Sequence, residues 1–229
     1  MRGTFYQAGP RARHQPFFIV IIAGAKGFAK EVLEVVFQAD SRARVAFYDD
    51  VTPDLPLLLH GRYPILRTAE EARQWLAQDQ RFTLGVGSPQ VRRALAEKLR
   101  QLGGVLTSTI SPRATIGAFG NQIGAGCNVM TGAVLTGDIS LGEGVLINLN
   151  CTIGHDSIVQ DYCELSPGVH VSGHVALGPN CVLGTGAVVL PGVEIGANSV
   201  IGAGSVVTKN VAADTLAVGI PAKAIKSLA

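Results

Sequence analysis

The chain has 229 residues, a formal net charge of +2 at pH 7 and only 16% charged residues. This length suits one or two domains with a sizeable core, and the near-neutral charge gives no indication of a nucleic-acid partner. No stretch approaches the roughly 18 consecutive apolar residues of a transmembrane helix. Many apolar residues combined with few charges favour a protein that forms an oligomer.

The first segment, residues 1–16, is polar and basic without periodicity, and we expect a flexible extension there. Its arginines precede the apolar run PFFIVIIAGA, an arrangement similar to a short signal peptide. The strand and helix patterns that follow explain this run better as a buried strand. We therefore expect a cytoplasmic protein.

Residues 17–105 alternate predicted strands with predicted helices, which is typical of a small parallel α/β domain. One helix begins after Thr68, where Glu71 completes the spacing of a capping box. Strands are expected at residues 17–22, 44–50 and 82–88.

Two glycine turns in this domain indicate a ligand. The turn Gly24–Gly27 lies between a predicted strand and a predicted helix, and it lacks the full G-x-G-x-x-G motif. Backbone N–H groups at such a helix start bind phosphate, and Asp49 and Asp50 end the next strand, where carboxylates accept hydrogen bonds from a ribose or base. The second turn, residues 85–88, should lie beside the first. Together these features favour a nucleotide-bearing ligand over plain turn geometry.

Residues 123–212 follow a six-residue period without a slip. Each of fifteen hexads begins with Ile, Val or Leu and carries Ala, Ser, Cys, Val or Ile at its fifth place. This period predicts a parallel β-helix with three hexads in each triangular coil. The β-helix domain is expected over residues 106–214, with one extra residue in IGAFGNQ that should swell a corner. Residues 215–229 leave the repeat and are expected to cap the open end, finishing as a short helix.

All four cysteines occupy the inward fifth place of a hexad, so we predict buried core residues, not metal ligands or nucleophiles. Cys163 and Cys181 fall one coil apart on the same face, but a disulfide is not expected in a cytosolic chain. The four are Cys127, Cys151, Cys163 and Cys181.

His155 and Asp156 take the third and fourth places of the hexad IGHDSI, which puts both side chains on an outward corner. A neighbouring carboxylate can fix the tautomer of an imidazole and raise its basicity, as a general base requires. The alternative is a solvated corner pair without function. His170 and His174 fall in different hexads and do not reproduce the spacing of the zinc-binding histidines in β-helix carbonic anhydrases, so no metal site is expected.

Several stretches together resemble one family, the bacterial sugar acetyltransferases of the sialic acid O-acetyltransferase type, which include N-acetyltransferases of nucleotide-linked 4-amino-sugars. These stretches are GAKGFAKEV, FYDD, INLNCTIGHD, PGVEIGANSVIGAGSVVTKNV and VGIPAKAI. The resemblance covers residues 17 to about 226. It implies a half-Rossmann α/β domain followed by a left-handed β-helix, acetyl-CoA as co-substrate without a metal, and a homotrimer with active sites between subunits.

The resemblance also implies roles for particular residues. It makes His155 the catalytic base and Asp156 its partner, places Asn148 near the acceptor, and directs the backbone N–H of Gly173 at the thioester carbonyl. The implied coenzyme A contacts are Gly173, Gly184, Ala187, Gly202, Ala203, Lys209, Pro221 and Lys223. The implied nucleotide-sugar contacts are Gly24, Lys26, Gly27, Phe28, Asp49, Asp50 and Gly87. Family members often carry histidine at two positions where this chain has Phe28 and Glu164, which leaves the sugar open.

The expected function is therefore acetyl-CoA-dependent N-acetylation of a nucleotide-linked 4-amino-sugar, within polysaccharide biosynthesis. Transfer should be direct, because the inward cysteines cannot carry an acyl group. One alternative is an O-acetyltransferase that acts on sialic acid or another sugar hydroxyl. An alternative of another class is a non-catalytic β-helix that serves as a scaffold or nucleotide-binding module.

Overall fold

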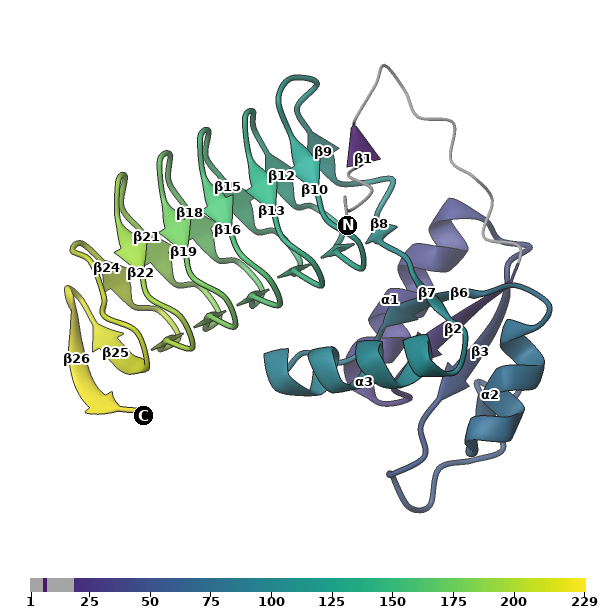
Figure 1. Cartoon of the computed structure of the whole chain (residues 1–229). Coiled ribbons are helices and arrows are strands. Elements are labelled where there is room, and N and C mark those ends of the chain that lie inside the picture. The colour runs from purple at the N-terminus through teal and green to yellow at the C-terminus, as the bar shows by residue number, and fades with distance from the viewer. Residues whose placement is uncertain (1–5, 8–18) are drawn as a thin grey trace.

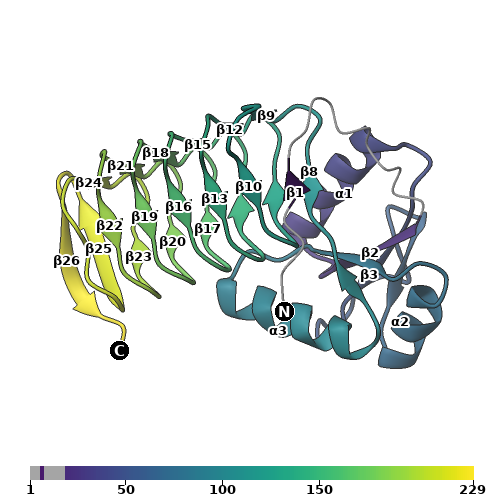
Figure 2. The same ribbon diagram turned by 45° about the horizontal axis from the view of Figure 1, so that its top comes forward.

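The computed structural model describes residues 6–7 and 19–229, as an α/β domain joined to a long stack of coils (Figure 1). The coils start at β8, beside the α/β domain, and end at the hairpin of β25 and β26, which carries the C-terminus (Figure 2). Within the expected flexible extension, only Tyr6–Gln7 (β1) are described, and they pair antiparallel with β10. The rest of that segment, and the start of the first predicted strand, lie outside the described residues.

The α/β domain holds a six-stranded sheet in the order β4-β5-β3-β2-β6-β7, parallel except for the β4–β5 pair. Its predicted alternation of strands and helices is present, and Thr68 and Glu71 form the predicted capping box at the start of α2. The short strands β4 and β5 have no counterpart among the predicted strands, because each is too brief to show a period. The elements are β2 Ile19–Ala23, α1 Gly27–Ala39, β3 Arg44–Tyr48, β4 Leu58–Leu59, β5 Tyr63–Leu66, α2 Ala69–Leu76, β6 Arg81–Leu84, α3 Pro89–Gln101 and β7 Val105–Leu106.

The hexads form a parallel β-helix with three faces, each a sheet of two-residue strands. Each strand pairs with the one a full coil later, as Thr152 does with His170 and His170 with Val188, so three hexads make one coil as predicted. The β8 sheet contains β8 Thr109–Ile110, β11 Asn128–Val129, β14 Leu146–Ile147, β17 Glu164–Leu165, β20 Val182–Leu183 and β23 Val200–Ile201. The β9 sheet contains β9 Thr115–Ile116, β12 Val134–Leu135, β15 Thr152–Ile153, β18 His170–Val171, β21 Val188–Val189 and β24 Val206–Val207. The β10 sheet contains β1 together with β10 Gln122–Ile123, β13 Ser140–Leu141, β16 Ile158–Val159, β19 Ala176–Leu177 and β22 Glu194–Ile195.

Tight corners join these faces. The fourth place of a hexad takes the left-handed backbone conformation, which glycine adopts freely and Asn or Asp tolerates. The extra residue of IGAFGNQ lies in the corner before β10, as expected, where the Asn121 side-chain amide donates to the carbonyls of Gly117 and Thr136. Residues other than glycine in the left-handed fourth place are Asp138, Asn150, Asp156, Tyr162, His174, Asn180 and Asn198.

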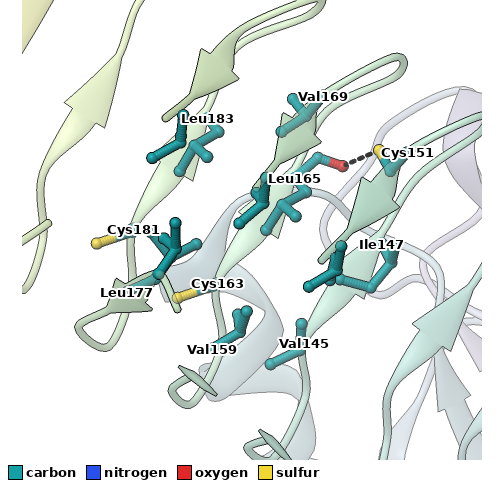
Figure 3. Packing of buried hydrophobic residues seen from close by; sticks show 14 of the residues in the cluster. Val145, Ile147, Cys151, Val159, Cys163, Leu165, Val169, Leu177, Cys181 and Leu183 are labelled. Atoms are coloured by element: carbon teal, nitrogen blue, oxygen red, sulfur yellow. Dashed lines mark hydrogen bonds between the residues drawn. The ribbon is translucent and has the colours of Figure 1, made fainter. Parts of the chain in front are cut away.

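The interior of the β-helix is one apolar cluster, built from the first and fifth places of the hexads. All four cysteines lie in it as free thiols, as the register predicts. Figure 3 shows three of them, Cys151, Cys163 and Cys181, among the aliphatic side chains. Their thiols bond to backbone carbonyls of the next coil, for example Cys163 Sγ to Gly178 O at 3.0 Å. Burial raises the pKa of the Cys127 thiol to about 12 and that of Cys151 to about 11. These groups stay protonated and take no part in surface chemistry.

A buried arginine joins the two parts of the chain. Arg92 of α3 is fully buried, and its guanidinium donates to Gly144 O at 2.9 Å, to Asn128 Oδ1 at 2.8 Å and to Val86 O at 2.8 Å. Burial lowers the pKa of Arg92 to about 10, so the side chain remains charged at neutral pH. Because Val86 belongs to the second glycine turn, this one side chain holds that turn against the coils.

The C-terminal segment is a β-hairpin, so the short helix expected there is wrong. β25 (Thr215–Gly219) pairs in parallel with β23, and β26 (Ala222–Ser227) pairs antiparallel with β25. The open edge of the last coil offers backbone hydrogen bonds that a helix could not satisfy, and this overrides the local helical composition. Ala217 of β25 is buried and closes the apolar interior.

Candidate active site

The corner between β15 and β16 presents His155 and Asp156 to solvent, as their register predicts. His155 Nδ1 lies 2.7 Å from Asp156 Oδ2, and the two side chains are 62% and 48% exposed. An ionised carboxylate only accepts hydrogen bonds, so Nδ1 carries the proton and Nε2 of the neutral ring keeps a free lone pair. The bond to His155, together with the nearby His174, lowers the pKa of the Asp156 carboxyl.

Gly173 lies directly beside this imidazole, in the corresponding corner one coil later. A Cβ on Gly173 would be 2.8 Å from His155 Nε2 and 2.8 Å from its Cε1. Any side chain at residue 173 would therefore displace the His155 ring from its present position. Gly173 therefore adjoins the His155 ring, and its own N–H has no backbone acceptor among the described residues.

His174 lies beside His155 and Asp156, a proximity that the hexad pattern alone did not predict. Its Nε2 lies 3.6 Å from Asp156 Oδ2, and its ring meets that of His155 edge-on with centroids 5.0 Å apart. His155 and His174 are separated in the sequence by one coil plus one residue. This spacing indicates that they are neighbours only when the length of one coil is known. His170, by contrast, lies on the β9 sheet and bonds to Thr152 Oγ1 at 2.9 Å.

The expected coenzyme A contacts fall into two rows of corners within one chain. Gly173 and Lys209 share the row of His155, between the β9 and β10 sheets. The other expected contacts lie in two places. Some are on the row of corners between the β8 and β9 sheets, which the β9 sheet separates from the row of His155, and the rest are in the C-terminal hairpin. Ala187 is an inward fifth-place residue of the core, so only its backbone faces outward. The remaining expected contacts of this second row are Gly184, Gly202 and Ala203, with Pro221 and Lys223 in the hairpin, and the expected acceptor residue Asn148 lies on the same row.

Asn148 is therefore not brought to His155 by its own chain. It is 8% exposed, and its Oδ1 accepts the backbone N–H of Leu149 at 2.7 Å. Two rows of corners separated by one face can meet only if a second copy of the chain packs against the first. The separation of the two rows is compatible with active sites shared between subunits, and the trimer stays a prediction.

The two glycine turns of the α/β domain lie side by side, as predicted. Gly24 has φ +106°, and a Cβ there would be 2.7 Å from Val86 Cγ1. α1 starts at Gly27 without a side-chain cap, and Lys26 and Gly27 are exposed, so the helix start presents unpaired N–H groups. This edge has the chemistry of a phosphate site.

The two carboxylates at the end of β3 already have partners in the protein. Asp49 is buried, and its Oδ1 accepts the backbone N–H of Thr52 at 2.9 Å. Asp50 accepts from the Tyr48 hydroxyl at 3.0 Å and forms an ion pair with Lys98. Phe28 is partly buried and packs against the core of the α/β domain. All the hydrogen bonds and ion pairs of these two carboxylates in the described part of the chain go to Asp49 Oδ1 and Asp50 Oδ2. Asp49 Oδ2 is therefore one oxygen that can still accept a bond.

Gly87 lies against the β-helix. A Cβ on Gly87 would be 3.1 Å from Glu164 Oε1 of β17, and burial raises the pKa of the Glu164 carboxyl. The glycine turns and the outward face of β17 therefore form one continuous surface. Elsewhere, a shallow groove of about 510 Å³ crosses the β10 sheet near Ala176 and Glu194, and none of the residues expected in the site lines it. In the described part of the chain no helix is long and apolar enough to span a bilayer.

Comparison with known proteins adds an independent line of evidence. The profile of the PglD N-terminal domain matches residues 19–99, and that of the bacterial transferase hexapeptide (six repeats) matches residues 174–209. A comparison with curated protein sequences found no significant match. Solved structures, however, match over nearly the whole chain.

The acetyltransferase domain of PglB from Neisseria gonorrhoeae is 30% identical over 91% of this chain and 100% of its own, with a TM-score of 0.83. The chain belongs to this family of hexapeptide-repeat acetyltransferases with a PglD-type first domain. A mutant of perosamine N-acetyltransferase from Caulobacter crescentus, in complex with CoA and GDP-perosamine, is 29% identical over 98% of this chain and 100% of its own, with a TM-score of 0.83. WeeI from Acinetobacter baumannii is 29% identical over 90% and 99%, with a TM-score of 0.84.

Family membership confirms the resemblance and the left-handed β-helix fold expected from the sequence. It also makes the chain an acyltransferase, so the non-catalytic scaffold is excluded.

Proposed function

We propose that this acetyltransferase transfers the acetyl group of acetyl-CoA to the amine of a nucleotide-linked 4-amino-sugar. The observation that carries the proposal is the His155–Asp156 pair, whose 2.7 Å bond leaves Nε2 unprotonated beside Gly173, a residue whose N–H has no backbone acceptor in the described part of the chain. The similarity to a perosamine N-acetyltransferase in complex with CoA and GDP-perosamine supports the choice of substrates.

In this proposal His155 Nε2 accepts a proton from the amine as its nitrogen attacks the thioester carbonyl. Asp156 stabilises the imidazolium that results. The N–H of Gly173 donates to the developing oxyanion, a contact typically worth about 3–4 kcal/mol. When the tetrahedral intermediate collapses, the C–S bond breaks and the imidazolium returns its proton to the leaving thiolate. No acyl-enzyme forms, because the four thiols lie inside the coils.

The sugar nucleotide would bind at the α/β domain. The uncapped start of α1 and the adjoining glycine turns offer backbone N–H groups to phosphates, and Asp49 Oδ2 is available to a ribose or base. Arg92 keeps this edge in a constant position against the coils. The cytoplasmic location and the role in polysaccharide biosynthesis expected from the sequence remain part of this proposal.

Acetyl-CoA would bind between two copies of the chain. His155 and Gly173 of one copy would face Asn148, Ala203 and the other corners of the second row on its neighbour, which accounts for two separated groups of expected contacts. A homotrimer closes such an arrangement with three equivalent sites. Light scattering should therefore give three times the chain mass.

Shared sites allow a complementation experiment. His155→Ala removes the base from one row of corners, and Ala203→Trp obstructs the other row, so each variant alone should be inactive. Co-expressed trimers contain some sites with both rows intact, and they should regain part of the activity. Mixed trimers without activity would contradict the shared site and leave the single-chain chemistry standing.

The substrate test is an acetyl-transfer assay over UDP-, GDP- and dTDP-4-amino-sugars with free sialic acid included. We expect transfer to one nucleotide-linked amine, and a loss of about 10²–10⁴-fold in kcat for His155→Ala with coenzyme A binding preserved by calorimetry. His170→Asn, an exposed histidine of the next coil, is the matched control. Acetylation of sialic acid alone would favour the O-acetyltransferase instead.

A further inference from the structure

Three side chains in two neighbouring corners present metal-binding atoms to one point. They belong to His155, Asp156 and His174, each of which offers one ligand atom within 4.8 Å of the other two. The nitrogens nearest to Asp156 Oδ2 are Nδ1 of His155 and Nε2 of His174. It is the one such group among the residues that the structure describes. We propose that His155, Asp156 and His174 form a binding site for Zn²⁺, and that the bound metal inhibits the enzyme. The inhibitory part rests on the proposed function of His155, whereas the binding part does not.

The geometry fits a zinc ion with little rearrangement. Zn²⁺ binds imidazole nitrogen and carboxylate oxygen at about 2.0–2.2 Å, which sets neighbouring ligand atoms of a tetrahedral site about 3.3–3.6 Å apart. The two distances to Asp156 Oδ2 are 2.7 Å from His155 Nδ1 and 3.6 Å from His174 Nε2. Because the three side chains are exposed, small rotations about their χ angles can bring the two histidine nitrogens and the Asp156 oxygen to one metal ion. The backbone needs no change, because consecutive coils hold both corners through the bond from His174 N to His155 O at 2.8 Å.

The donor set selects the kind of metal. Two imidazoles and one carboxylate suit Zn²⁺ and other late first-row ions, whereas Mg²⁺ prefers oxygen ligands and its own waters. All three side chains are about half exposed or more, so a hydrated ion can reach them. The four thiols, which would otherwise compete for zinc, are buried in the core.

Binding at Nδ1 has a specific consequence for the base. In the free protein the proton of the neutral His155 ring is on Nδ1, where Asp156 accepts it, and Nε2 holds the lone pair. A metal on Nδ1 needs the lone pair there, so the proton moves to Nε2, the nitrogen beside Gly173. No net proton is released, but His155 can no longer accept a proton from the substrate. Zinc would thus inhibit the enzyme through the tautomer, without filling either substrate site.

The binding test uses the intact protein without substrates. Zn²⁺ is titrated by calorimetry, and Co²⁺ is added as a probe whose visible absorption reports nitrogen and oxygen ligands in a four-coordinate site. One zinc per chain is expected. His174→Asn and Asp156→Asn should each weaken binding by about tenfold or more, since even residues that only support metal ligands contribute 10–100-fold. The control His170→Asn should bind as the unchanged protein does, and Mg²⁺ should give no signal.

The inhibition test compares the activity of each variant in the presence of zinc with the activity of the same variant in the presence of a chelator. Zinc should inhibit the unchanged protein and His170→Asn reversibly, and should inhibit His174→Asn at least about tenfold more weakly. Absence of zinc binding, or binding that His174→Asn leaves intact, overturns the site and has no bearing on the acetyltransferase. Stoichiometric binding at these residues without inhibition overturns the inhibitory role and, with it, the assignment of His155 as base.

Discussion

The imidazole of His155 lies over the α-carbon of Gly173, so closely that a Cβ at residue 173 would be 2.8 Å from Nε2. The two residues belong to consecutive coils and are neighbours only because the coils stack in register. The proposed base therefore keeps its position through the absence of a side chain on the next coil. This relationship can be tested by adding a side chain at residue 173.

Gly173→Ala should lower kcat by about 100-fold, because displacing a reacting group by about 1 Å has this effect. The backbone of Gly173 does not have a positive φ, so alanine fits the chain and acts through the imidazole. Gly137→Ala is the matched control, at the third place of the preceding corner, where a Cβ makes only an ordinary contact at 3.4 Å to Phe119 O. Steady-state kinetics and thermal unfolding of both variants check the prediction. Equal kcat values for the two would show that the ring position is immaterial.

Arg92→Met should destabilise the protein by about 2–4 kcal/mol, because three buried acceptors would lose a charged donor. For a chain of this size that is a decrease in Tm of roughly 5–15 °C. Arg42→Met is the control, since its side chain is 84% exposed and its ion pair with Asp40 contributes little. Denaturant unfolding gives the free energy directly. A Tm within a degree or so of the unchanged protein would mean that the junction does not depend on this side chain.

The four cysteines should be inert in the folded protein. Burial raises the pKa of Cys127 to about 12, so its reactive thiolate is scarce at pH 8 and no reagent can reach the sulfur. Ellman's reagent should detect no thiol in the native protein and four after unfolding in guanidinium. Two thiols after unfolding would instead indicate a disulfide, which the free thiols of Cys163 and Cys181 exclude here.

Glu164→Gln should raise the thermal stability at neutral and alkaline pH. Burial raises the pKa of the Glu164 carboxyl above its value in the unfolded chain, so the stability linked to this group is complete at acid pH and is lost as pH rises through the folded-state pKa. Glutamine stays neutral, and the difference in Tm between variant and unchanged protein should grow from pH 4 to pH 8. Glu97→Gln, on the exposed face of α3, is the control and should show no such trend. A difference in Tm that is independent of pH would contradict this account.

Much of the fold could be predicted from the sequence because the signal is local and repeated. The six-residue period gives the three-sided coil, sends Cys127 and its counterparts inward, and turns His155 and Asp156 outward. The capping box at Thr68 and the paired glycine turns are likewise local patterns. Each depends on residues a few positions apart, so tertiary contacts do not alter them.

What the sequence did not predict has one cause, which is pairing with partners distant in the sequence. The last segment is a strand and not the expected helix, because the edge of β25 is available to pair with it. Two further contacts have no local pattern that would predict them. Asp50 pairs with Lys98 of α3, and the stacking of coils brings His174 to Asp156.

The sequence by itself determined the architecture, the direction in which each hexad side chain points, and the acetyltransferase family, because a six-residue repeat and its motifs are properties of neighbouring residues. Only the tertiary structure decided which outward side chains meet. Coil stacking sets Gly173 and His174 beside His155 and Asp156, and the fully buried Arg92 holds the glycine turn beside Glu164. The physical reason is that each of these contacts joins residues a coil or a domain apart, and packing chooses such partners.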